Sequence, residues 1–144
     1  MRYWDSSALV PLLVAQAATA QMQGIADDDS AAVTWWGSHI ECVSALARLE
    51  REGALTTAAC GEAVARLRTI ATGWTEVNAS TQVREHAMRL LRVHPLRAVD
   101  AIQLAAAIAA ADQQPRALDF VTLDARQAEA AEKEGFSVLP PASQ

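Results

Sequence analysis

The sequence predicts an α/β fold in which a short central sheet is covered by helices. Three observations support this: 51% of the residues are hydrophobic and 20% charged, 32 are alanine, and short strand-like apolar runs alternate with longer helical ones. This composition is typical of one globular domain, here spanning residues 1–144. A chain of this length buries enough surface to fold without a metal or a disulfide.

Four short and mainly apolar segments are predicted to be strands. Their brevity and composition are typical of a mostly parallel sheet of four to five strands, covered on both faces. They span residues 1–4, 32–35, 117–122 and 136–139.

Seven helices are predicted between these strands, because Ala, Leu, Arg, Glu and Gln favour the helical conformation. They span residues 6–16, 19–26, 38–52, 56 or 57 to 72, 80–93, 98–112 and 125–134. Gly53, Gly73 and Gly135 end three of them, and Pro95 ends a fourth because proline disfavours helix in the preceding residue. The segment 98–112 is nearly all Ala, Ile and Leu, so we expect it to be buried all round.

Four acidic residues lie where predicted elements begin or end. Asp5 follows the first strand, Glu41 lies near the start of the helix after the second, Asp100 opens the alanine-rich helix, and Asp124 follows the third strand. Ligands bind at the carboxyl ends of strands in an open parallel sheet, so the fold should bring these acids to one edge. Clustered carboxylates repel one another, and oxygen ligands without His or Cys favour Mg²⁺ or Mn²⁺. The pattern predicts a cation site able to hydrolyse a phosphodiester.

Each of these acids also has a structural interpretation, as a helix cap or a first-turn carboxylate. On that interpretation the chain is a non-catalytic α/β interaction protein. A phosphotransfer receiver domain also clusters acids at strand ends, but it needs a strand-end lysine, and Lys133, the only lysine, lies late in the last helix. Asp119 competes with Asp124, but five residues of strand separate them by roughly 16 Å, so both cannot ligate one metal, and only Asp124 follows the strand's carboxyl end.

The net charge is −5, from 17 acidic and 12 basic residues. This balance argues against a basic groove for duplex nucleic acid. Four of the negative charges belong to the proposed site, which leaves the rest of the chain near neutral. We expect a cytoplasmic protein, because no apolar run reaches the roughly 18 residues of a membrane span and the N-terminus lacks a leader pattern.

For several other residues a structural role is favoured over a functional one. Cys42 and Cys60 lack metal-site spacing and are expected to be buried free thiols. The acidic run 27–29 is expected to be a solvated loop, because it lacks the pattern of an EF-hand. His86 and His94 are expected to be surface or packing residues.

The sequence before Glu41 contains paired tryptophans. We expect the side chains of Trp35, Trp36 and Trp74 to lie in the core rather than to stack against RNA bases, although an exposed tryptophan can stack a base. His39, beside them, has a less favoured interpretation as a proton shuttle.

The acidic segments, taken in order, resemble those of PIN-domain ribonucleases, and most nearly the VapC-type toxins of bacterial toxin-antitoxin modules. The resemblance rests on YWDSSALV around Asp5, the helix carrying Glu41, LRAVDAIQLAAA around Asp100, and FVTLD ending at Asp124. It spans almost the whole chain and includes the late segment 135–138. The tryptophans and His39 depart from it, because small polar residues are usual there.

The resemblance implies a PIN-like three-layer α/β/α fold and a Mg²⁺- or Mn²⁺-dependent endoribonuclease that a small antitoxin protein silences. Asp5 and Asp100 match the principal metal ligands, and Glu41 and Asp124 complete the acidic cluster. We also expect a homodimer and an RNA substrate.

The same matching assigns supporting roles. Ser7 and Thr122 match hydroxyl positions that hold the carboxylates by hydrogen bonds. Arg97, one helical turn before Asp100, is expected to contact a phosphate or steady a carboxylate.

The first two helices carry more apolar side chains than a covered sheet requires, so an antitoxin peptide is expected to bind there and to place an arginine near the acids. These side chains are Leu9, Val10, Leu12, Leu13, Val14 and Met22.

Overall fold

The computed structural model describes residues 1–142, in which five parallel strands form one sheet. The strands are β1 (Arg2–Trp4), β2 (Ala32–Trp35), β3 (Thr75–Val77), β4 (Asp119–Val121) and β5 (Ser137–Leu139). Their order across the sheet is β3-β2-β1-β4-β5, and every neighbouring pair is parallel. The connections run through helices, as parallel pairing requires.

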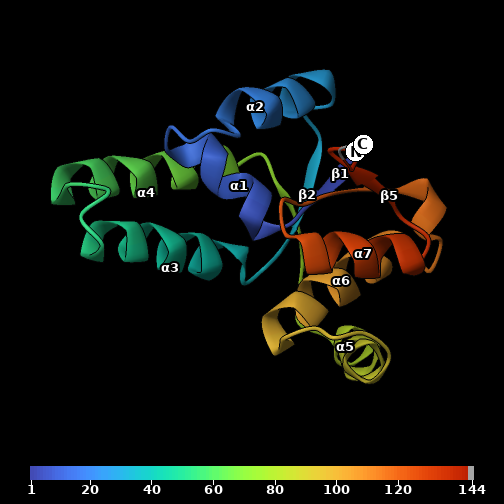
Figure 1. Ribbon diagram of the computed structural model, residues 1–144. Helices are drawn as coiled ribbons and strands as arrows, with labels where there is room; N and C mark the ends of the chain where they lie inside the picture. The colour runs from blue at the N-terminus through green and yellow to red at the C-terminus, as the bar shows by residue number, and fades with distance from the viewer. Residues whose placement is uncertain (143–144) are drawn as a thin grey trace.

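Helices cover both faces of this sheet, so the α/β/α layering predicted from the sequence is confirmed (Figure 1). The first four are α1 (Ser6–Leu13), α2 (Thr19–Asp28), α3 (Ser38–Arg51) and α4 (Thr57–Ala71). The others are α5 (Thr81–Val93), α6 (Ala98–Ala110) and α7 (Ala125–Lys133). In Figure 1, α1–α4 lie to the left of the sheet and above it, and α5–α7 lie to its lower right.

The two cores arise from the alternation of side chains along each strand. Tyr3 and Phe120 point toward α5–α7 and stack with ring centroids 5.3 Å apart. Trp4 and Val121, the next residue on each strand, point toward α1–α4. Helix α6 is buried along most of its length, but Ala98, Val99 and Ala110 are exposed, so the expectation that it is buried all round is correct only in part.

The strand β3 and several boundaries differ from the sequence prediction. β3 is an edge strand whose residues are exposed or half-buried, so it carries no apolar run to predict it. β4 begins at Asp119 because the preceding residues form a short 3₁₀ turn, Pro115–Ala117. Helix α1 ends at Leu13 and α6 at Ala110, each earlier than expected.

The expectation of an exposed apolar surface on the first two helices is wrong. Leu9, Leu13 and Met22 are at most 2% exposed, Val10 is buried, and the other two residues are half-buried. Helices α3 and α4 form a hairpin that packs against α1, and its side chains join the same core. The amphipathic pattern there encodes packing within the chain.

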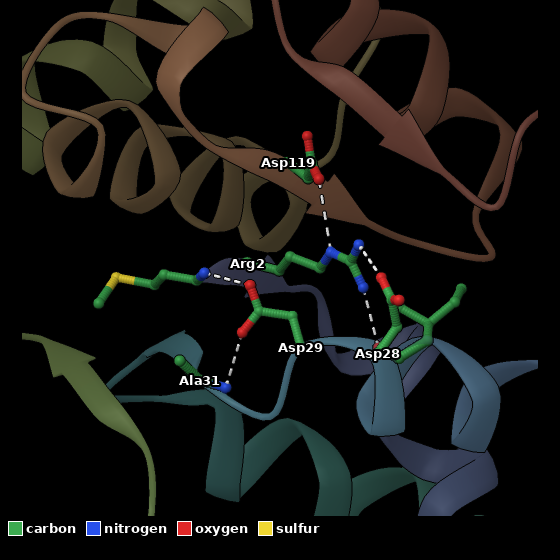
Figure 2. A network of polar contacts seen from close by, with 7 residues as sticks. Arg2, Asp28, Asp29, Ala31 and Asp119 are labelled. Carbon is green, nitrogen blue, oxygen red and sulfur yellow. Dashed lines mark hydrogen bonds and ion pairs between the residues drawn. The ribbon is translucent and has the colours of Figure 1, made fainter.

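At the edge of the sheet opposite the acidic cleft, Arg2 joins the amino end of β1 by ion pairs to the amino end of β4 and to the end of α2 (Figure 2). Arg2 Nη2 lies 2.7 Å from Asp28 Oδ2, and Arg2 Nε lies 3.4 Å from Asp119 Oδ2. The amino group of Met1 pairs with Asp29. The expected loop at 27–29 is therefore wrong in part, because α2 extends through Asp28 and two of the three acids are paired.

The remaining expectations concern single residues. Cys42 and Cys60 are free and buried, as predicted. His94 is buried, with its Nε2 atom 2.7 Å from Glu134 Oε2. Within residues 1–142, no helix is both long enough and apolar enough to cross a membrane.

Candidate functional site

A cleft of about 440 Å³ opens at the carboxyl edge of the sheet, and all four predicted acids line it. Asp5 follows β1, Asp124 follows β4, Glu41 lies in the first turn of α3, and Asp100 lies in the first turn of α6. The parallel sheet therefore brings together residues that are up to 119 positions apart in the sequence. Asp119, at the amino end of β4, is excluded from this cleft by its position.

Asp5 occupies the N-cap position of α1, yet its carboxylate makes no capping hydrogen bond. Instead, Asp5 Oδ2 accepts hydrogen bonds from Ser7 Oγ at 2.7 Å and Thr122 Oγ1 at 2.8 Å. The residue is only 5% exposed, and this burial raises the pKa of Asp5, with the charges of Asp100 and Asp124 adding to the effect and the two hydroxyls opposing it. The capping interpretation therefore does not describe Asp5.

Glu41 is half-buried and held by two donors. Its Oε2 accepts from Gln103 Nε2 at 2.7 Å, and its Oε1 accepts from Ser6 Oγ at 3.2 Å. Burial raises the pKa of Glu41 from 4.5 to about 7; the hydrogen bond from Gln103 opposes this shift and the charge of Asp5 reinforces it. Gln103 is itself buried and accepts a hydrogen bond from Tyr3, which ties Glu41 to the core.

Asp100 is paired with Arg97. Arg97 Nε lies 3.2 Å from Asp100 Oδ2, and the Arg97 backbone N–H donates to the same oxygen at 3.3 Å. The structure thus shows the carboxylate contact, one of the two roles expected for Arg97. The Arg97 side chain is 68% exposed, so its guanidinium remains open to a further anion.

Asp124 does act as a helix cap. Its Oδ1 accepts from the backbone N–H groups of Arg126 at 2.9 Å and Gln127 at 3.2 Å. The interpretation of Asp124 as a helix cap is therefore confirmed, and the same side chain also lines the cleft.

Four further polar residues around the cleft were not singled out from the sequence. Ser6, Ser44 and Arg48 line it, and Gln103 holds Glu41. Helical spacing contained a signal for two of them: Gln103 is a lone polar residue one turn after Asp100 in an apolar helix, and Arg48 lies two turns after Glu41. His39, the suggested proton shuttle, lies outside the residues that line the cleft.

The donor chemistry of the cleft fits a hard divalent cation, because carboxylate and hydroxyl oxygens predominate. Within residues 1–142, however, no three His, Cys, Asp or Glu side chains converge closely enough to hold a metal ion. Like charges repel, and each carboxylate is held by its own donor: hydroxyls for Asp5, an amide for Glu41, and a guanidinium for Asp100. Burial is the main cause of the raised pKa values of Asp5 and Glu41, the neighbouring carboxylates add to it, and the hydrogen-bond donors offset it only in part.

Comparison with known proteins agrees with this architecture. No family model matches the sequence. "Ribonuclease VapC45" and "Ribonuclease VapC49", both from Mycobacterium tuberculosis, are each 31% identical to it over 110 residues, which is 76% of this chain and 76% of the relative. A solved structure described as a toxin-antitoxin complex from Klebsiella pneumoniae matches the fold with a TM-score of 0.66, at 16% identity and 100% coverage of both chains. The chain belongs to the VapC-type family of PIN-domain ribonucleases.

Proposed function

We propose that this protein is a Mg²⁺- or Mn²⁺-dependent endoribonuclease, the toxin of a type II toxin-antitoxin module. The observation that carries the proposal is the meeting of Asp5, Glu41, Asp100 and Asp124, from four separate elements, in one cleft. The names of the relatives support RNA as the substrate.

Asp5 and Asp100 would hold the cation, with Glu41 and Asp124 completing its surroundings. When bound, such a cation polarises a phosphoryl oxygen and lowers the pKa of bound water. Ser7 and Thr122 fix the orientation of Asp5 through hydrogen bonds to the same oxygen.

Glu41 is the group best suited to accept a proton from the attacking water. A general base must lie within hydrogen-bond reach of the water that it activates, and the hydrogen bonds from Gln103 and Ser6 fix the Glu41 carboxylate in the cleft. Arg97 would leave Asp100 when the cation binds there, because both compete for one carboxylate. Its exposed guanidinium would then contact the substrate phosphate.

The test is RNA cleavage by Asp5→Asn and Asp100→Asn variants in Mn²⁺, with Asp119→Asn as the matched control. Asp119 lies at the opposite edge of the sheet and pairs with Arg2. We expect the two cleft variants to lose cleavage while their circular dichroism stays unchanged, EDTA to stop the wild-type reaction, and Asp119→Asn to remain active. An Asp5→Asn protein as active as wild type would refute the mechanism.

The capping role of Asp124 favours one alternative, an interaction protein in which the acids serve only the fold. Titration calorimetry with Mn²⁺ separates the two. Binding that weakens in an Asp5→Asn, Asp100→Asn double variant supports the nuclease, and its absence supports the interaction protein.

We also propose a small antitoxin protein as inhibitor and a homodimer as the assembled state. Because the first two helices are packed within the chain, the antitoxin would act at the cleft, where the Arg97 pair shows that Asp100 accepts a guanidinium. Cleavage with and without the product of the neighbouring gene tests inhibition, and sedimentation velocity tests the dimer. Equal cleavage in both conditions would refute inhibition, and a monomer at every concentration would refute the dimer.

A further inference from the structure

One of the tryptophans is displayed on the surface beside the cleft. Trp36 is 55% exposed, whereas Trp4 is buried and Trp35 and Trp74 are half-buried against the two cores. The expectation that the tryptophans belong to the core is therefore wrong for Trp36. Trp36 does not stand alone, because Ile40, 62% exposed, lines the same hollow, and a contiguous apolar surface of this kind indicates a binding site.

The backbone that carries Trp36 is fixed on both sides. Its N–H donates to the Val77 carbonyl at 3.0 Å, which ties the turn to β3. The next residue, Gly37, lies so close to Trp35 that an added Cβ would come within 2.4 Å of the indole nitrogen. Trp36 therefore stands on an anchored turn, and little backbone entropy remains to be lost when a ligand packs against it.

Polar groups stand beside the indole in a hollow of about 290 Å³, lined by Trp36, His39, Ile40 and Glu76. His39 Nδ1 lies 3.4 Å from Glu76 Oε1, and the imidazole packs edge-on against Trp74 with ring centroids 5.2 Å apart. The carboxylate of Glu76 accepts hydrogen bonds and donates none. The hollow thus combines a flat aromatic face with a positioned acceptor, which suits a planar ring bearing N–H groups.

This hollow adjoins the acidic cleft. Ile40 is 62% exposed and lines both, and the next residue along α3 is Glu41. A strand whose phosphate lies at the carboxylates therefore passes Ile40 to reach Trp36. The adjacency favours a base of the same RNA over an unrelated ligand.

We propose that Trp36, with Glu76 and His39, forms a nucleobase subsite for an unpaired base of the RNA next to the cleavage site. The inference rests on the proposed ribonuclease function. Stacking on Trp36 serves any base, and Glu76 adds a preference for guanine, which presents neighbouring N–H donors, over uracil, which presents mainly acceptors. His39 positions the carboxylate through its contact with Glu76.

The experiment measures binding of two fluorescently labelled single-stranded RNAs, a short uridine oligonucleotide and a copy carrying one guanosine, in Ca²⁺, which takes oxygen ligands and offsets the repulsion between the carboxylates and the phosphate. The variants are Trp36→Ala, Trp36→Phe and Glu76→Gln. The matched control is Met88→Ala, because Met88 is also 55% exposed but lies on α5. We expect Trp36→Ala to bind about tenfold more weakly, as loss of one stacked base implies, Trp36→Phe to retain most of the affinity, and Glu76→Gln to lose the guanosine preference.

Cleavage kinetics in Mn²⁺ separate this inference from the proposed function. If wild type cleaves RNA and Asp5→Asn does not, but Trp36→Ala binds and cleaves with unchanged KM and unchanged cleavage sites, the subsite is refuted and the nuclease stands. If Trp36→Ala changes only the sedimentation coefficient, the indole belongs to a protein interface and the inference is overturned. A raised KM with little change in kcat supports it.

Discussion

The buried charge of Glu41 should destabilise the metal-free protein, and the free energy of unfolding of a Glu41→Gln variant measures by how much. Burial raises the pKa of Glu41 from 4.5 to about 7. Below pH 4.5 the carboxyl is neutral in both folded and unfolded chains, so it costs nothing. Between pH 4.5 and 7 only the unfolded chain loses the proton, so the free energy of unfolding falls as pH rises; above 7 the full cost is present.

The size of this cost follows from the shift. One pKa unit corresponds to about 1.4 kcal/mol, so the shift of Glu41 gives about 3 kcal/mol, and solvent screening of a half-buried group lowers the expected value to about 2 kcal/mol. Glutamine keeps the shape and an amide oxygen to accept from Gln103, but carries no charge. Glu41→Gln should therefore be more stable than wild type by about 2 kcal/mol at pH 8.

Urea unfolding in EDTA at pH 5 and pH 8 tests this prediction. The gain should be small at pH 5 and appear by pH 8. Glu52→Gln, at the exposed end of the same helix, serves as the control and should change stability equally at both pH values. A Glu41→Gln variant with no gain at pH 8, or with an equal gain at both, would refute the reasoning.

Three further predictions concern the ion pairs and the core. Arg97→Gln should bind Mn²⁺ about two- to fivefold more tightly by calorimetry, because the cation no longer competes with an exposed ion pair to Asp100; unchanged affinity would contradict the competition. Burial raises the pKa of Glu134, but hydrogen bonds from an arginine and from His94 outweigh it and hold the pKa below its usual range. Its stabilisation is therefore present above pH 4.5 and lost at lower pH, so Glu134→Gln should lose about 1–2 kcal/mol at pH 7 and nothing below its folded pKa, measured by urea unfolding; a constant loss across pH would rule this out. Phe120→Ala should lower the free energy of unfolding, measured in urea, by about 3–5 kcal/mol, because the ring is fully buried against Tyr3 and Phe136. A loss under about 1 kcal/mol would contradict this prediction and show that the core collapses into the space left by the ring.

The α/β class and the four acids of the cleft could be predicted because they depend on local patterns and one topological rule. Asp5 directly follows β1 and Asp124 lies three residues beyond the last residue of β4, and parallel strands place their carboxyl ends at one edge. The same rule rejected Asp119, which the structure places at the opposite edge beside Arg2.

Other features depend on partners distant in sequence. The strand β3 forms because β2 offers it a hydrogen-bonding edge, and its own residues carry no apolar pattern. The apolar side chains of α1 and α2 resembled a docking surface until the α3–α4 hairpin accounted for them. The spacing of apolar residues predicts that a helix has an apolar face, but only the tertiary packing decides whether the same chain or another molecule covers that face.

The sequence by itself determined the helices, every strand except β3, the excess of acid, and the positions of the four carboxylates at element ends, because these follow from residue type and spacing. Only the tertiary structure decided how each carboxylate is held. The hydroxyls on Asp5, the amide on Glu41 and the guanidinium on Asp100 are contacts between specific atoms, and burial sets the pKa values. It also decided that Trp36, alone among the tryptophans, stands at least half exposed beside the acids, because exposure depends on which neighbours the fold leaves out.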